Sequence, residues 1–158
     1  MRWRLPEWLK RLGARLASAF TRRKGAEPNE RQKTGAWGED VAARHLRKEG
    51  YAIAGRRVRP DARNDEIDII ARKGGVLVFV EVKTRANERF GRPALAVDGR
   101  KRRALCRGAA AFIRRAGHPR MTYRFDIVEV VGSRQSKEPP VVRHIEDAFR
   151  LPAGRRMG

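Results

Sequence analysis

EIDIIARKGGVLVFVEVKT, residues 66–84, contains two runs of β-branched and other apolar residues on either side of a Gly-Gly pair. This pattern predicts a β-hairpin. We expect Arg72 to pair with Leu77 across the hairpin, which places Asp68 opposite Glu81. Directly opposed side chains have Cβ atoms about 5 Å apart, and like charges there are destabilising. A divalent cation between the two carboxylates removes this repulsion, so the pair suggests a metal site.

The strand that carries Glu81 and Lys83 is otherwise apolar on both faces. Leu77 and Phe79 share the face of Glu81, and valines occupy the other face. A strand that is apolar on both faces is buried, and buried charges are rarely kept unless they are paired or bind metal. The alternatives are a structural salt-bridge cluster and a solvated strand face. The same register places Glu66 opposite Lys83, which makes Glu66 a candidate to hold that lysine.

Composition indicates a polyanionic partner. The 158 residues carry a formal net charge of +20, and a charge of this sign favours nucleic acid or an anionic membrane surface. The length suits one domain with a tail. Cys106 is the only cysteine, which excludes an intrachain disulfide and a zinc site built on cysteines, and suits a reducing cytosol. No segment approaches the roughly 20 apolar residues of a membrane span.

The chain divides into three parts. Residues 1–33 are predicted to form a basic amphipathic helix, over about residues 1–24, and a linker. The helix suits contact with a membrane surface, nucleic acid or a partner; the alternatives are packing on its own domain and disorder. Residues 34–150 form the main domain, and residues 151–158 are predicted to be a disordered tail.

The main domain is predicted to be an α/β domain with a mixed β-sheet flanked by helices, in the order α-β-β-β-α-β-β. After the first helix and its stop at Gly50, a strand leads into the hairpin, and a second helix separates the hairpin from the last strands. The expected elements are a helix over 36–49, strands over 51–58, 66–72 and 76–84, a turn at 89–93, a helix over 98–116, and strands over 123–131 and 141–145. The inward stripe of the second helix is predicted to be Leu105, Ala109, Phe112 and Ile113.

Both predicted helices carry charges of interest. Glu39 follows Gly38 on the first helix, where glycine permits close approach of another backbone; Glu39 either points to the hairpin or is an acid favoured by the helix dipole. Four consecutive basic residues begin the second helix, and we expect them to contact phosphate, although a solvated helix face is the usual meaning of such a run. They are Arg100, Lys101, Arg102 and Arg103.

The hairpin acids suit metal-assisted hydrolysis of phosphodiesters. Asp68 and Glu81 supply the hard oxygen ligands that Mg²⁺ or Mn²⁺ prefers, and the Val82 carbonyl is a third candidate ligand. A metal ion lowers the pKa of a water that attacks phosphorus. Lys83 then orients the water or stabilises the charge that develops on the phosphate. Glu39 either completes the metal shell or holds Lys83.

Four motifs together resemble the YraN family of small bacterial proteins. They are Gly35-x-x-Gly38-Glu39, Glu66-Ile67-Asp68-Ile69-Ile70, Val78-Phe79-Val80-Glu81-Val82-Lys83-Thr84-Arg85 and Arg124-Phe125-Asp126-Ile127-Val128. The resemblance covers about residues 34–149 and does not extend to the basic N-terminal helix.

The resemblance implies a restriction-endonuclease-like PD-(D/E)xK nuclease fold, similar to that of Holliday-junction resolvases. Asp68, Glu81 and Lys83 occupy the matching catalytic positions, with Glu39 as the helical acid of resolvase-like members. Arg85 and Lys101 match basic positions of the family. Asp65 departs from the pattern, because a glycine commonly stands there, and it adds negative charge near the expected metal.

We therefore expect a Mg²⁺- or Mn²⁺-dependent endonuclease that acts on nucleic acid, with branched or flapped DNA as its substrate. The alternative is a non-catalytic nucleic-acid-binding or interaction protein whose acids and lysines form a structural ion-pair network. We expect a cytoplasmic protein, associated with the nucleoid or, through residues 1–24, with a membrane. Resemblance to resolvases implies a homodimer.

Overall fold

The computed structural model describes residues 27–60, 65–87, 98–117 and 122–150. Two helices and five strands occur there, in the predicted order α-β-β-β-α-β-β. The elements are α2 (Glu30–Lys48), β1 (Ala52–Val58), β2 (Ile67–Lys73), β3 (Val76–Arg85), α3 (Gly99–Ala116), β4 (Tyr123–Val131) and β5 (Val141–Phe149).

The five strands form one mixed sheet in the order β1-β2-β3-β4-β5. Neighbouring strands are antiparallel except β3 and β4, which are parallel. A parallel connection needs a crossover, and α3 occupies it. β2 and β3 are joined by Gly74 and Gly75, whose φ angles of 55° and 85° are those of a tight hairpin turn that favours glycine. This turn fixes the register of the two strands that carry the predicted site.

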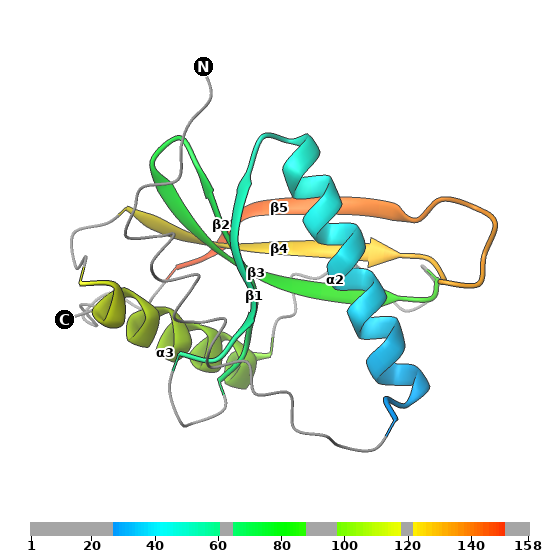
Figure 1. Ribbon diagram of the computed structural model, residues 1–158, viewed down its shortest axis with the longest axis horizontal. Coiled ribbons are helices and arrows are strands. Elements are labelled where there is room, and N and C mark those ends of the chain that lie inside the picture. Colours follow the sequence, from blue (N-terminus) through cyan, green and yellow to red (C-terminus); the bar gives the residue numbers. More distant parts are fainter. Residues whose placement is uncertain (1–26, 61–64, 88–97, 118–121, 151–158) are drawn as a thin grey trace.

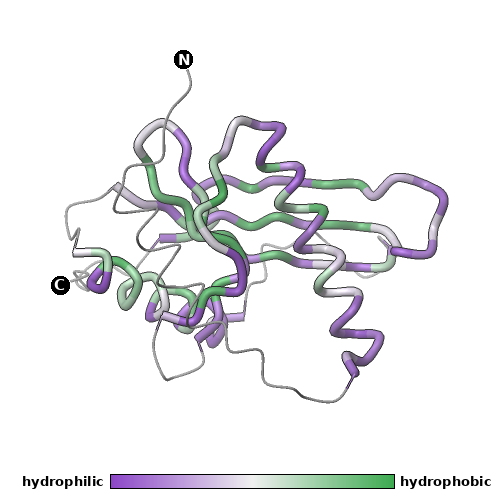
Figure 2. Tube along the Cα trace, in the orientation of Figure 1, coloured by the Kyte–Doolittle hydropathy of each residue, from purple (hydrophilic) through white to green (hydrophobic). Residues whose placement is uncertain are grey.

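The helices cover opposite faces of the sheet (Figure 1). On one face, α2 buries Val41, Ala42 and Leu46 against alternate residues of the strands, including Val78 and Val80 of β3. On the other face, α3 buries the predicted stripe of Leu105, Ala109, Phe112 and Ile113 against a set that includes Leu77 and Phe79. The central strands are apolar along most of their length (Figure 2), as expected for strands buried on both faces.

Two predicted boundaries need correction. The first helix begins at Glu30 rather than residue 36, because Asn29 accepts from Gln32 N–H while the Gln32 side chain accepts from Asn29 N–H. This capping box extends the helix into the segment predicted to be a linker. The last strand reaches Phe149 rather than residue 145, because a β-bulge carries it past Asp147, where φ is 48°.

Several predictions lie outside the described residues. They concern the N-terminal amphipathic helix over residues 1–24, a turn at residues 89–93 and the tail over residues 151–158. Within the described residues, neither helix is long and apolar enough to cross a membrane.

Candidate active site

The hairpin has the predicted register, and it ends in a side-chain contact. Arg72 pairs with Leu77, and the ladder continues to Ile69 opposite Val80. The ladder pairs predicted beyond this point, Asp68 with Glu81 and Glu66 with Lys83, are not formed. Instead Val82 N–H donates to Asp68 Oδ2 at 2.8 Å. The Asp68 carboxylate thus takes the place of the backbone carbonyl that would accept from Val82 N–H in a continued ladder. This hydrogen bond fixes Asp68 against the end of β3.

Glu81 lies between two lysines in the cluster that forms the candidate site. Lys83 Nζ lies 2.9 Å from Glu81 Oε1, and Lys101 Nζ of α3 lies 3.2 Å from Glu81 Oε2. Glu81 is 2% exposed, and both lysines are half-buried. Oε2 is buried and accepts no hydrogen bond of normal geometry, so Lys101 reaches it as an ion pair only.

Burial and mutual repulsion disfavour the charged forms of the carboxylates in this cluster. Burial, followed by the charge of Glu81, raises the pKa of Asp68 to about 7, against the opposing hydrogen bond from Val82. Burial also disfavours the charged form of Lys101, but the carboxylates of Glu81 and Asp68 outweigh it and raise the pKa of Lys101. Two buried carboxylates that repel one another, with cations drawn in beside them, form a site in which further positive charge is stabilised.

The donor set fits a hard divalent cation. Within the described part of the chain, no three His, Cys, Asp or Glu side chains are grouped to hold a metal ion, so a site here needs Asp68, Glu81 and a backbone donor. The N–H and C=O of one strand residue point to the same side. Because Val82 N–H points to Asp68, the Val82 carbonyl lies on that side as well, where it suits the predicted third ligand.

Glu39 is positioned by a close approach of α2 to β3. A Cβ on Gly38 would lie 1.9 Å from Thr84 Oγ1, so only glycine fits between the helix and the strand. Glu39, which is buried, accepts two hydrogen bonds from Arg57, at 2.6 Å from Nε and 3.2 Å from Nη2. The hydrogen bonds from Arg57 account for the buried position of Glu39 without a contact to Lys83 or to a metal ion. The charge of Glu39 nevertheless contributes to the raised pKa of Asp68.

The acids that precede β2 are paired with arginines. Glu66 Oε2 lies 2.6 Å from Arg59 Nη2; its predicted supporting role toward Lys83 is not seen, because β2 begins only at Ile67 and Lys83 turns to Glu81. Asp65 accepts from two guanidinium nitrogens of Arg107 on α3, at 2.8 and 3.0 Å. The negative charge expected from Asp65 is therefore neutralised by α3.

The five predicted nucleic-acid contacts lie in three different settings. Arg100 and Arg103 are exposed on α3. Arg102 is also exposed and lies over the Phe149 ring, 5.9 Å from its centroid. Lys101 belongs to the acid cluster, and Arg85 lies 3.4 Å from the buried Glu129.

α3 carries more exposed arginines than its first turn suggested. Arg100, Arg103, Arg107 and Arg114 are exposed, and their spacing places them within about 60° of one another on the helix. At about 1.5 Å per residue they extend along about 21 Å of helix. Arg107 and Arg114 were not among the nucleic-acid contacts predicted from the sequence. The spacing of three, four and seven residues along the row is the sequence signal that could have identified them.

A second buried acid, Asp126 of the Arg-Phe-Asp motif, lies on the α2 face of β4. It is fully buried and accepts from Arg124, from Asp147 N–H at 3.0 Å and, at 2.7 Å, pairs with His144 Nε2. Burial opposes its charge, but the contacts with His144 and Arg124 prevail and lower the pKa of Asp126. Tyr51 continues this network by donating to Glu146 and accepting from Arg124.

Comparison with known proteins gives one consistent result. The sequence profile of the uncharacterised protein family UPF0102 matches residues 38–130. A UPF0102 protein of Symbiobacterium thermophilum is 48% identical over 99 residues, which are 63% of this chain and 82% of the relative. UPF0102 proteins of Geobacter sulfurreducens and Chlorobaculum tepidum are 41% and 40% identical, over 74% and 77% of this chain and 88% and 95% of the relatives. The matched region includes the whole acid cluster.

Proposed function

The chain belongs to the UPF0102 family, the YraN family of the sequence resemblance, and we propose that it is a metal-dependent nuclease that hydrolyses phosphodiester bonds of DNA. One observation carries the proposal. Two buried carboxylates, Asp68 and Glu81, lie beside two lysines, and one buried carboxylate oxygen has no hydrogen bond of its own. Buried carboxylate oxygens in this setting are suited to bind a hard divalent cation, which supports the proposal.

The residues of the cluster divide the chemistry between them. Asp68, Glu81 and the Val82 carbonyl would hold Mg²⁺ or Mn²⁺. When bound, the ion supplies charge neutralisation and activation of water for hydrolysis. Lys83 Nζ, now 2.9 Å from Glu81, stabilises the charge that develops on the phosphate oxygens. Water adds to phosphorus and gives up a proton, the bond from phosphorus to the leaving oxygen breaks, and that oxygen takes up a proton in turn.

The exposed arginine row of α3 is the proposed surface for the nucleic-acid backbone. Its first turn also carries Lys101, which reaches Glu81, so the row begins at the cluster. Phosphate contacts of this kind position a duplex without reading its sequence. A branched or flapped DNA is the proposed substrate, and a cytoplasmic location follows from such a substrate.

A second candidate function is supported by the same ion pairs. Lys83 and Lys101 together neutralise Glu81, which is the arrangement expected of a structural ion-pair network. Under this candidate, the protein binds nucleic acid or a partner and cleaves nothing.

Cleavage of labelled DNA separates the two candidates. Duplex, single-stranded, flap and four-way-junction DNA are incubated with Mg²⁺ or Mn²⁺. We expect Lys83→Ala to lower the cleavage rate at least about 100-fold, because charge stabilisation at the reacting phosphate is lost. Lys73→Ala is the matched control: it removes one exposed lysine from the far end of the same hairpin and should change the rate less than about twofold. DNA binding without cleavage by the pure wild type would favour the second candidate.

A further inference from the structure

Arg57 has a backbone conformation that arginine seldom adopts. Its φ angle is 50°, in the left-handed region where glycine and asparagine are the usual residues. Strained residues of this kind persist where the surrounding structure holds them, and they cluster at functional sites. Arg57 is near the end of β1, an edge strand of the sheet.

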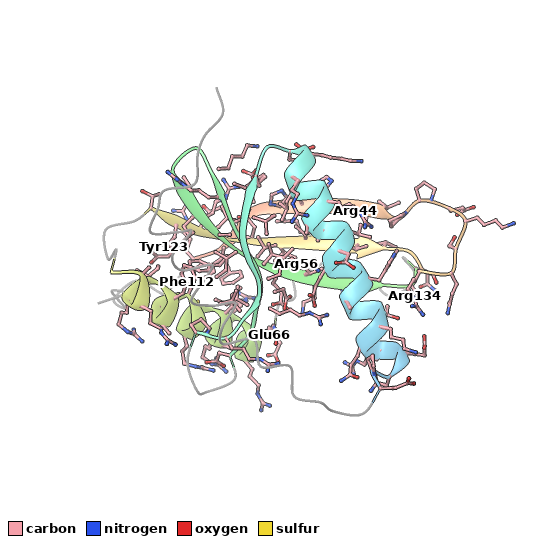
Figure 3. All side chains as sticks on the ribbon, in the orientation of Figure 1. Arg44, Arg56, Glu66, Phe112, Tyr123 and Arg134 are labelled. Atoms are coloured by element: carbon pink, nitrogen blue, oxygen red, sulfur yellow. The ribbon has the colours of Figure 1, made fainter. Side chains whose placement is uncertain are left out.

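The unusual conformation changes the direction of the side chain. Neighbouring side chains of a regular strand point to opposite faces, yet Arg56 and Arg57 both reach Glu39. Arg57 Nε lies 2.6 Å from Glu39 Oε2 and Arg56 Nη2 lies 4.0 Å from the same oxygen. Arg56 also pairs with Asp40 at 2.6 Å, which ties it to α2, where Figure 3 shows it. Arg57 is therefore turned toward the α2 side of the site at the expense of local strain.

Arg57 is both held and accessible. Glu39 takes the Nε and Nη2 hydrogens, so the Nη1 end has no partner among the described residues. The side chain remains 42% exposed. Arg57 also lies within the electrostatic range of the acid cluster: hydrogen bonding to Glu39 is the main cause that raises its pKa, and the charges of Glu66 and Asp68 add to the effect.

A purely structural ion pair would not need this arrangement. Arg56 already contacts Glu39 and Asp40 from a regular strand position, so Glu39 has a cation nearby without Arg57. A guanidinium whose one edge is fixed by a carboxylate and whose other edge is open is suited to bind a phosphate, because it is pre-oriented and always charged.

We propose that Arg57 binds a phosphate of the nucleic-acid substrate next to the scissile one, and that Glu39 is a positioning residue that holds Arg57 rather than a metal ligand. This inference rests on the proposed nuclease function. It places one phosphate contact on β1, across the acid cluster from the arginine row of α3. The substrate backbone is then held on both sides of Asp68 and Glu81.

The first test is the salt dependence of DNA binding by the full chain without metal. Arg57→Asn removes the guanidinium while its side chain still tolerates the left-handed backbone. We expect the slope of log K against log salt concentration to fall by about 1, as for the loss of one phosphate contact. Arg44→Gln is the control, since it removes one exposed charge of α2 and should leave the slope unchanged.

The second test is a double-variant cycle on cleavage with Mg²⁺. We expect Arg57→Asn to lower kcat/KM at least about tenfold. Glu39→Gln should lower it less, and the double variant should be no slower than Arg57→Asn alone, because Glu39 acts through Arg57. The double variant also leaves no buried Glu39 charge unpaired, so it controls for a loss of folding.

The outcomes are distinguishable. If the wild type binds and cleaves DNA while Arg57→Asn matches Arg44→Gln in slope and rate, the inference is overturned and the proposed function stands. If Glu39→Gln abolishes Mn²⁺ binding in calorimetry, Glu39 is a metal ligand and its positioning role is refuted. If the wild type binds no DNA, the proposed function fails and the inference fails with it.

Discussion

Asp68 with Glu81 on one side of the sheet, and Asp126 on the other, are buried acids with opposite surroundings. Asp126 has donors for both oxygens, from Arg124, His144 and the Asp147 N–H, and its pKa is lowered. Asp68 has one backbone donor, and burial with the charge of Glu81 raises its pKa to about 7.

Burial alone therefore does not mark a functional acid in this protein. Donors around Asp126 are sufficient to satisfy it, so that cluster is closed to a ligand and fixes the β5 bulge. In the Asp68 and Glu81 cluster, Glu81 Oε2 is buried without a hydrogen bond of normal geometry, and a bound cation would complete it. The difference lies in the number of hydrogen-bond donors, which are set by neighbouring strands and helices.

We call the surroundings of Asp126 the closed cluster and those of Asp68 and Glu81 the open cluster. The largest effect on stability is expected from a substitution in the closed cluster. Asp126→Asn should lower the free energy of unfolding by about 3 kcal/mol, because it leaves Arg124 without its buried counter-charge and weakens the contact with His144. Glu81→Gln should change it by less than about 1 kcal/mol, because its lysine partners are half-buried and can turn to water. Urea unfolding at neutral pH measures both. Equal losses in the two variants would remove the distinction between the clusters.

A smaller effect concerns the pH dependence of metal binding at the open cluster. An ion binds the carboxylate form of Asp68, so the proton must leave. Because its pKa is about 7 without metal, Mn²⁺ affinity should rise up to about tenfold per pH unit below that value and level off above it. Calorimetry over this range measures the slope. An affinity independent of pH would show that Asp68 is already ionised or is not a ligand.

The smallest effect is expected in the acid stability of the closed cluster. The folded protein holds the pKa of Asp126 below its ordinary value of 3.8. Its contribution to stability is thus present above the unfolded-state pKa and is lost as the pH falls through the folded-state pKa. Asp126→Asn should lack this component, so the difference in unfolding free energy between wild type and variant should narrow as the pH falls from about 5 through the folded-state pKa of Asp126. A constant gap would contradict this assignment.

The sequence predicted those parts of the molecule that depend on local pattern. The register of Arg72 with Leu77 followed from alternation and the glycine turn, and the inward stripe of α3 followed from helical spacing. The helix start at Glu30 was missed, because the capping residues Asn29 and Gln32 lie in a polar segment that resembles a linker.

Local sequence patterns did not predict the side-chain contacts between elements that are far apart in the chain. Lys101 is 20 residues from Glu81 in the chain and reaches it only because α3 crosses back over the sheet. Arg57 reaches Glu39 through a left-handed backbone residue, for which neither arginine nor its neighbours give a sequence signal. The closed state of Asp126 likewise depends on partners supplied by β5 and its bulge.

The most direct measurement is a calorimetric titration of the metal-free protein with Mn²⁺, in the wild type, Asp68→Asn and Lys73→Ala. We predict that Mn²⁺ binds to the wild type and to Lys73→Ala. In Asp68→Asn the affinity should fall at least about 100-fold, because one of the two carboxylates that contact the ion is removed. Binding that is absent from the wild type, or unchanged in Asp68→Asn, would contradict the assignment of the open cluster as a metal site.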